Sequence, residues 1–334
     1  MKKAMALILA LMMMAAIVTG CAKQDAGTAT DGASTNTENS GDSSEKVFRA
    51  AHVCSSMSNE SDVYCWQVFQ EICADYGFEM TNFEGQWDVQ NEVKAIGTCI
   101  ADGYDAVFSC PSDIDGIVPA LMETKEAGLV VGMLSADLRT ENSQYRDFFV
   151  GINDIDAGKT AAQAVAERFP NGANAVEIGG TAGGDWQIKR HDGFLEGIDG
   201  TNIVMLDSQN TTNASGSEAM AIAEDFLTKY GDEIDVIYVH SDTMVTGVIE
   251  AIKNAGYEPG DFCIIGVDGC RIGYQQVKDG WQTICISQDF REQCVMELEV
   301  ARAVLTGEDY EELNYQIPTV VTADNIDDMP DPGW

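Results

Sequence analysis

Two short apolar runs separated by a helical pattern constrain the fold of this chain most strongly. Residues 235–242 and 262–269 are rich in β-branched and aromatic side chains, and the segment 243–256 between them has the spacing of an amphipathic helix. A gap of about twenty residues between two such strands is typical of a parallel βαβ unit. The pattern therefore predicts two neighbouring parallel strands joined by a crossover helix.

Each of these predicted strands ends in a polar pair, Ser241-Asp242 and Asp268-Gly269. In open α/β sheets the ligand crevice lies outside the carboxyl ends of the strands, so both pairs are candidates for recognition. Ser241 or Asp242 could instead simply cap the helix that follows. Gly269 indicates a loop that another group approaches closely, which favours a binding role for Asp268.

The same alternation of strands and helices extends along most of the chain. Strands are predicted at 47–54, 78–83, 106–109, 129–134 and 148–152, with helices at 63–76, 89–101 and 114–127 between them. After residue 152 the alternation restarts, with helices at 156–169, 186–197, 217–230, 272–279 and 291–305 and strands at 173–178, 203–206 and 282–287. Two consecutive sets of similar size predict an α/β fold with two doubly wound, Rossmann-like parallel-sheet lobes and a ligand cleft between them.

The first 46 residues have a different composition. Residues 1–20 combine Met1-Lys-Lys, an apolar run and small residues, which predicts an export signal, and the segment ending in Cys21 resembles a bacterial lipobox. We expect Cys21 to be lipidated and to become the mature N-terminus, with an ordinary signal peptide as the alternative. Residues 21–46 are mostly Thr, Ser, Gly, Asn, Ala and Asp and are predicted to be a disordered tether.

Composition narrows the possible partners. A formal net charge of −36 makes nucleic acid a poor partner, because phosphate binding requires a basic surface. No apolar segment after the signal approaches membrane-spanning length. Apart from Cys21 there are nine cysteines, most of them in apolar contexts. We expect most of these cysteines to be buried and to act as small hydrophobic side chains. Their spacing suggests no zinc site, and no metal or cofactor is expected.

Catalytic motifs are not apparent. His52, His191 and His240 are widely separated, and a hydrogen-bonded structural role is expected for the two that end strands, His52 and His240. Gly158-Lys159-Thr160 imitates the end of a phosphate-binding loop, but Asn153 stands where the first glycine is required. The chain is therefore predicted not to be an enzyme. A surface glycan hydrolase that uses paired carboxylates is the alternative from that class.

A glycine-rich turn, residues 179–184, precedes the predicted helix that carries Trp186 and Arg190. We expect its glycines to bring the backbone close to the contents of the crevice. Trp186 and Arg190 lie four residues apart and share a helix face. An indole packs on the C–H side of a sugar while a guanidinium donates to hydroxyls or a carboxylate, so this pair suits a polar small molecule.

Several segments together resemble the type 1 periplasmic binding protein family, in particular the ribose-binding-like sugar receptors of ABC importers. The segments are 238–244, 265–269, Arg190 to Phe194 and 277–280 followed by Gln288, and the resemblance spans residues 47–322. It implies three chain crossings between the lobes, near 150–153, 287–290 and 317–320. The first lobe would then comprise 47–151 and 289–317, and the second 152–288 and 318–334.

The resemblance also implies a set of ligand contacts. Arg190, Asp268 and Gln288 match the family's hydroxyl-binding residues, and Asn59 matches an asparagine of the first lobe. Elsewhere the family pattern changes: Ser241 replaces an asparagine, Ser61 and Asp62 replace two stacking aromatics, and Ser135-Ala136 replaces an Asp-Arg pair. The complete candidate set is Asn59, Ser61, Asp62, Ser135, Asp137, Trp186, Arg190, Asn213, Ser241, Asp242, Asp268 and Gln288.

These departures bear on the ligand. The first lobe loses the family's stacking platform, which Tyr64, Trp66 or Trp87 would have to replace alongside Trp186. A cationic ligand group facing Asp62, Asp137 and Asp268 is an option. We expect a monomeric, extracytoplasmic lipoprotein that captures a small polar ligand, foremost a sugar or sugar derivative, for an ABC permease. The alternative within the fold is a receptor that reports to a membrane sensor kinase.

Overall fold

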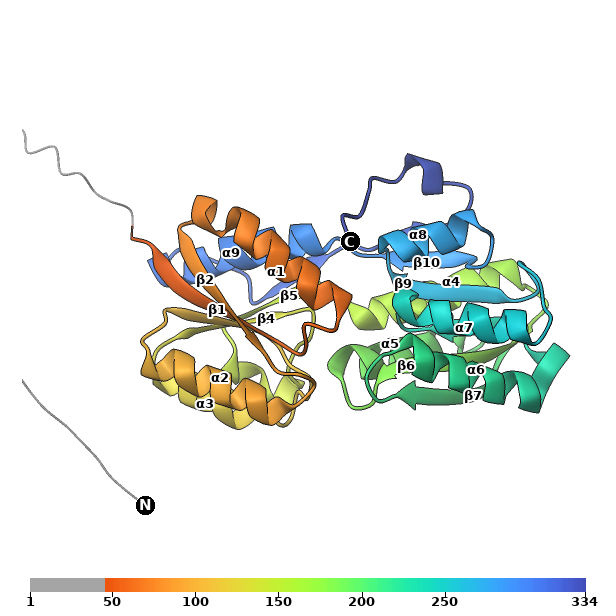
Figure 1. Cartoon of the computed structure of the whole chain (residues 1–334), viewed down its shortest axis with the longest axis horizontal. Helices are drawn as coiled ribbons and strands as arrows, with labels where there is room; N and C mark the ends of the chain where they lie inside the picture. Colours follow the sequence, from red (N-terminus) through yellow and green to blue (C-terminus); the bar gives the residue numbers. More distant parts are fainter. Residues whose placement is uncertain (1–45) are drawn as a thin grey trace, which may run out of the picture. The chain divides into compact units, whose positions relative to one another are not determined.

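The computed structural model describes residues 46–334, which contain two six-stranded sheets with helices on both faces (Figure 1). We call each sheet with its helices a lobe. The predicted α/β fold with two parallel-dominated sheets is confirmed. The predicted signal, most of the tether and Cys21 lie outside the described residues.

In the first lobe the strand order is β11-β5-β4-β3-β1-β2, and every pair is parallel. Its strands are β1 (Phe48–Cys54), β2 (Phe78–Glu84), β3 (Ala106–Cys110), β4 (Val130–Leu134), β5 (Phe148–Ile152) and β11 (Leu313–Gln316). Helices α1 (Glu60–Ile72) and α9 (Phe290–Thr306) cover one face, and α2 (Val89–Ala101) and α3 (Val118–Glu126) cover the other (Figure 1). Strands β4 and β5 are buried along their whole length, as expected between two helical layers.

In the second lobe the order is β12-β10-β9-β8-β6-β7, and only β12 is antiparallel. Its strands are β6 (Ala173–Thr181), β7 (Ile203–Thr211), β8 (Val236–Val239), β9 (Cys263–Asp268), β10 (Ile284–Ser287) and β12 (Thr319–Val321). Helices α4 (Asp154–Arg168) and α5 (Asp185–Ile198) pack on one face, and α6 (Gly216–Tyr230) and α7 (Asp242–Asn254) pack on the other. The remaining helix, α8 (Arg271–Lys278), follows β9.

Strands β6 and β7 extend beyond the predicted ranges. Residues 207–211 are polar, so hydropathy gave no reason to continue β7 past residue 206. The backbone nevertheless pairs with the glycine-rich segment of β6, for example Gly179 with Asn210 and Thr181 with Thr211. The extension carries both strands further toward the binding cavity described below.

Residues 318–334 were expected to belong to the second lobe, and Val321, Ile326 and Met329 do pack there, whereas the last residue, Trp334, also contacts the first lobe. Strand β12 pairs with β10, but the Trp334 ring stacks on Tyr64 of α1 at 6.1 Å between ring centroids and meets Phe290 of α9 at 5.0 Å. The carbonyl of Trp334 also accepts a hydrogen bond from the backbone N–H of Arg271 in α8, at 2.6 Å. Aromatic packing against first-lobe helices explains the difference.

Candidate ligand-binding site

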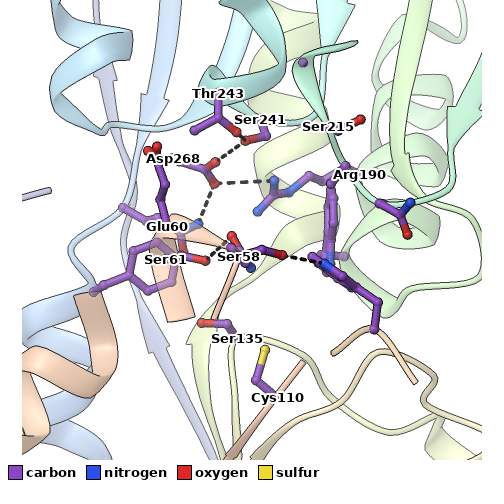
Figure 2. A pocket seen from close by; sticks show the side chains of 18 of the residues that line it. Ser58, Glu60, Ser61, Cys110, Ser135, Arg190, Ser215, Ser241, Thr243 and Asp268 are labelled. Carbon is purple, nitrogen blue, oxygen red and sulfur yellow. Dashed lines mark hydrogen bonds and ion pairs between the residues drawn. The ribbon is translucent and has the colours of Figure 1, made fainter. Parts of the chain in front are cut away.

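A cavity of about 810 Å³ lies between the carboxyl ends of the two sheets. Both lobes contribute to its wall, and Figure 2 shows the residues that line it. Nine of the twelve predicted site residues are among them: Asn59, Ser61, Ser135, Trp186, Arg190, Asn213, Ser241, Asp268 and Gln288.

Arg190 of α5 is the central charged group of the second-lobe wall. Only 4% of the residue is exposed, and its Nε donates to Asp154 Oδ1 at 2.7 Å while Nη1 donates to the carbonyl of His240. Nη1 also lies 3.7 Å from Asp268 Oδ1. Burial opposes the charge of Arg190, but Asp154 and Asp268 outweigh it and raise the pKa of the guanidinium. The fork is therefore fixed and charged before any ligand arrives.

Asp268 is the last residue of β9, and its side chain faces Arg190. Its carboxylate accepts hydrogen bonds from Ser241 Oγ at 2.7 Å and from Gln288 Nε2 at 3.0 Å, and Figure 2 shows the Ser241 and Arg190 side chains converging on it. Burial raises the pKa of Asp268, although Arg190, Ser241 and Gln288 act in the opposite direction. The group is thus a positioned acceptor at a strand end, as the sequence predicts.

Trp186 and Arg190 do lie together, as their spacing predicts. The guanidinium carbon is 5.1 Å from the centroid of the indole ring, which is within the range of a cation–π contact. The indole occupies the space where a Cβ on Gly180 would stand. The glycine at position 180 therefore makes room for Trp186, and not directly for a ligand as expected.

Most of the polar residues of the first-lobe wall are small side chains on loops or in the first turn of α1. Asn59 and Ser61 precede and begin α1, and Ser61 Oγ donates to Asn59 Oδ1 at 3.1 Å. Ser135 follows β4 and donates to Gln293 Oε1 at 2.9 Å. On the opposite wall Asn213 and Ser241 lie just before α6 and α7. Three helix N-termini therefore face the cavity, and their free N–H groups suit a ligand rich in hydroxyls.

Three predicted site residues, Asp62, Asp137 and Asp242, lie outside the cavity. Asp62 is buried beneath α1, where it accepts bonds from the Ser55 hydroxyl at 2.6 Å and the Ser56 N–H at 3.0 Å, and burial raises its pKa to about 6. It lies one residue beyond Ser61 and so points to a different side of the helix. Its role is to order the loop that precedes α1.

Asp137 pairs with the buried Arg146, whose Nη2 lies 3.1 Å from Oδ2 of the carboxylate. Asp242 accepts hydrogen bonds from Gln282 Nε2 and from the backbone N–H of Gly269, both at 2.7 Å, and burial raises its pKa to about 7. Asp268 is therefore the only carboxylate of the expected cationic-ligand group that lines the cavity, and Arg190 lies beside it. These contacts favour a neutral ligand over a cationic one.

Backbone strain marks the cavity more clearly than any sequence motif. Among the described residues, five that are not glycine have a positive φ, and all five line the cavity: Gln86 (56°), Trp87 (58°), Ser135 (61°), Ala214 (48°) and Asp268 (122°). Such conformations cluster at ligand-binding positions in proteins. Gln86 and Ala214 were not predicted as site residues, because neither residue type indicates a left-handed backbone conformation.

Other lining residues also escaped prediction: Ser58, Glu60, Cys110, Ser215, Gly216, Thr243 and Phe290. Of the three aromatics expected to replace the missing stacking platform, Trp87 lines the cavity. Tyr64 stacks on Trp334 instead, and Trp66 packs against the core of the first lobe. The first lobe therefore offers two aromatic side chains to the cavity, Trp87 on the β2–α2 loop and Phe290 at the start of α9.

His52, within β1, and His240, just after β8, both have structural environments, as expected. His52 is buried beside Asn82, 2.9 Å from its Oδ1, and burial lowers the pKa of the imidazole to about 4. His240 Nε2 lies 2.7 Å from the buried Glu177 Oε1. All nine cysteines between residues 46 and 334 are free, and seven are buried. No group of possible metal ligands occurs in that range, and none of its helices is long and apolar enough to span a membrane.

Comparison with known proteins places the fold and site in context. Residues 51–309 match the periplasmic binding protein domain family. The chain belongs to this family. The match confirms the resemblance drawn from the sequence, and it is consistent with a binding function rather than an enzymatic one.

Several similar proteins are named for the sugars that they bind. The chain is 33% identical over 212 residues to the galactofuranose-binding protein YtfQ of Escherichia coli strain K12, covering 61% of this chain and 65% of that protein. It is 27% identical over 284 residues to the fructose import binding protein FruE of Bifidobacterium longum strain NCC 2705, covering 84% and 82% of the two chains. A crystal structure of a galactofuranose binding protein superposes with a TM-score of 0.79 at 24% identity, covering 84% of this chain and 96% of that one.

Proposed function

We propose that this chain is an extracytoplasmic receptor that captures a sugar or sugar derivative between its lobes and delivers it to an ABC importer. The observation that carries the proposal is the buried network of Arg190, Asp268, Ser241 and Gln288 at the strand ends of the second lobe. Its members alternate donors and acceptors at fixed positions, which is the arrangement that vicinal hydroxyls require.

The surroundings of this network support a carbohydrate over other polar ligands. Trp87, Trp186 and Phe290 offer aromatic surface for the C–H faces of a sugar ring. The carboxylate of Asp268 already has Arg190, Ser241 and Gln288 as partners, so it does not require a cationic group on the ligand. The named relatives bind galactofuranose and import fructose, which agrees with a neutral, polyhydroxylated ligand.

The mechanism that we propose uses no covalent chemistry. A ligand that contacts both walls stabilises the state in which the lobes are closed over it, in proportion to its differential affinity for that state. The import role of the relatives makes a permease the partner that would recognise closure. Cys21 would hold the receptor at the membrane through a lipid, and its substitution by alanine should release the protein from the membrane fraction. Continued lipid labelling of Cys21→Ala would show that Cys21 is not the lipidated residue.

A thermal-shift screen tests the binding function. Monosaccharides, disaccharides, polyols, amino sugars and nucleosides are added in turn to the wild type and to Asp268→Asn. A ligand present at 100 times its Kd should stabilise the wild type by about 2.7 kcal/mol, and Asp268→Asn should lose most of that shift. Asp279→Asn, an exposed aspartate of the same lobe, is the matched control. The absence of a shift with every carbohydrate and polyol would overturn the proposal.

A further inference from the structure

We propose that the ligand has two units and that an outer cavity beside Trp87 holds the second one, so that the preferred ligand is a disaccharide. The inference rests on the proposed function, because it extends the same site. The outer cavity has a volume of about 470 Å³ and is separate from the 810 Å³ cavity, yet Trp87 lines both. The indole is therefore the shared wall of two adjoining spaces.

The way in which Trp87 is held supports a dedicated role. Gln86 and Trp87 form the centre of a turn closed by a hydrogen bond from Asp88 N–H to the Gly85 carbonyl at 3.1 Å, and both have a positive φ. Such turns favour glycine and asparagine at these two positions, because a Cβ makes the left-handed conformation costly. An aromatic side chain at such a position is rare.

Two hydrogen bonds fix the strained turn against the first lobe. The Trp87 backbone N–H donates to the carbonyl of Ser55 at 2.9 Å, and the indole Nε1 donates to Ser58 Oγ at 3.1 Å. The ring is thus oriented by its own polar atom while its faces are left for contact. Strain that is retained and compensated in this way is typical of ligand clamps.

The outer cavity has polar groups from both lobes. Its first-lobe side includes Ser112 and Arg139, whose Nε lies 2.9 Å from Asp115 Oδ1 in an exposed pair. Its second-lobe side includes Thr212 and the backbone around Gly183, where a Cβ would meet no atom within 4 Å. Asp88 and Asp113 also line this cavity, so the aromatic wall faces carboxylate acceptors as well as hydroxyl, guanidinium and open backbone groups. This combination is suited to a sugar ring that remains partly solvated.

Another cavity that adjoins the main one has a different lining. A third cavity of about 380 Å³ adjoins the main one through Glu60 and Thr243, but no aromatic residue lines it, and Met220 and Ile272 contribute apolar surface. A second sugar unit would find no stacking surface there. The main cavity alone is already near the upper end of the roughly 300–1,000 Å³ that small-molecule pockets span, which leaves room for a linkage toward Trp87.

Calorimetric titration of disaccharides against their component monosaccharides tests the inference. The probes are glucose with maltose and cellobiose, galactose with lactose and melibiose, and fructose with sucrose. The variants are Thr212→Trp, which fills the outer cavity from an exposed position, and Ser217→Trp, which fills the third cavity from the same lobe. Circular dichroism and thermal melting confirm that each variant folds like the wild type.

We expect at least one disaccharide to bind about tenfold tighter than its components, and Thr212→Trp to remove that advantage while monosaccharide affinity stays within about twofold. Ser217→Trp should preserve the advantage. Equal affinity for both sizes, or an equal loss for both in Thr212→Trp, would overturn the outer subsite and leave the proposed function standing. If no carbohydrate of either size bound the wild type, the proposed function and this inference would both be wrong.

Discussion

The two walls of the cavity are built in opposite ways. On the second lobe, Arg190, Asp268 and Gln288 are at most 9% exposed and bond to one another or to buried partners. On the first lobe, Ser58 in the loop before α1 and Glu60 at the start of α1 are exposed, and the aromatic contributed by the β2–α2 loop is held on a strained turn. The second wall is pre-organised by its own charges, whereas the first is positioned mainly by loop conformation.

The difference suggests a division of labour. A wall whose donors and acceptors are fixed before binding loses little conformational entropy when the ligand arrives, so it should supply most of the affinity. A wall of short polar side chains on loops can adapt to ligands of different shape. We therefore expect the second lobe to determine whether a sugar binds and the first lobe to determine which sugar is preferred.

Removal of Arg190 should give the largest effect. Arg190→Ala leaves the buried Asp154 without its 2.7 Å partner, and breaking a buried ion pair costs about 3–5 kcal/mol of stability. Ligand affinity should fall more than about 100-fold, because a buried charged hydrogen bond is lost. Chemical denaturation and calorimetry measure the two effects.

Arg190→Lys separates charge from geometry. Lysine retains the charge but has no planar fork, so stability should recover in part while ligand affinity remains low. If Arg190→Ala bound its ligand as tightly as the wild type, the second wall would not be the principal recognition surface.

Glu297 tests whether a buried carboxyl of the first lobe has partners for its charge, as Asp154 and Asp268 of the second lobe have in Arg190. Both oxygens of Glu297 in α9 are buried without a hydrogen-bond partner among the described residues, and burial raises its pKa well above the ordinary value of 4.5. Because the pKa is higher in the folded state, the stabilising contribution is complete below 4.5 and is lost as the pH rises through the raised value.

Glu297→Gln cannot ionise, so the wild type should lose stability relative to this variant as the solution becomes alkaline. The expected difference is about 1–3 kcal/mol, the cost of an unsatisfied buried group. Urea denaturation at acid and alkaline pH measures it. Parallel pH profiles for the two proteins would contradict the account of an uncompensated charge.

Trp87→Ala should weaken ligand binding about tenfold, because one aromatic contact is worth about 0.5–1.5 kcal/mol beyond its buried area. Trp87→Phe should restore most of the affinity. The melting temperature should change little in either variant, since the turn lies outside the core clusters. An unchanged affinity in Trp87→Ala would mean that the Trp87 indole does not stack on the ligand.

The smallest effect should come from Gln86. Gln86→Gly relieves a left-handed backbone and should stabilise the protein by up to about 1 kcal/mol, while the greater freedom of Trp87 lowers affinity. Lys94→Gly, at an exposed position in the interior of α2, is the control and should destabilise by about 0.5–1 kcal/mol. A destabilising Gln86→Gly would show that the turn is not strained.

The comparison also explains what could be predicted from the sequence. Strand-end polar residues such as Asp268 were found because the topology of a parallel sheet places them at one edge. Regular elements of the first lobe were predictable as well: helix 89–101 and strand 148–152 have the predicted bounds because their hydrophobic patterns are regular and their ends are marked. The pre-organised wall was therefore largely predictable.

The first-lobe wall was much less predictable from the sequence. Asp62 follows Ser61 in the sequence but points away from the cavity, because direction around a helix depends on where the helix begins. The strained turn at Gln86 and Trp87 has no glycine at either of its two positions of positive φ, so the residue types do not reveal it. Loop conformation and tertiary hydrogen bonds, such as the one from Trp87 to Ser58, decide these positions, and residue types alone do not determine them.

Hydrogen exchange with and without the best carbohydrate of the screen tests the central claim most directly. If the sugar bridges both walls, amide exchange should slow at 58–61 and 134–136 on the first lobe and at 240–243 and 268–269 on the second. Protection confined to one lobe, or centred on the separate cavity that Asp137 and Arg146 line, would contradict binding between the two sheets.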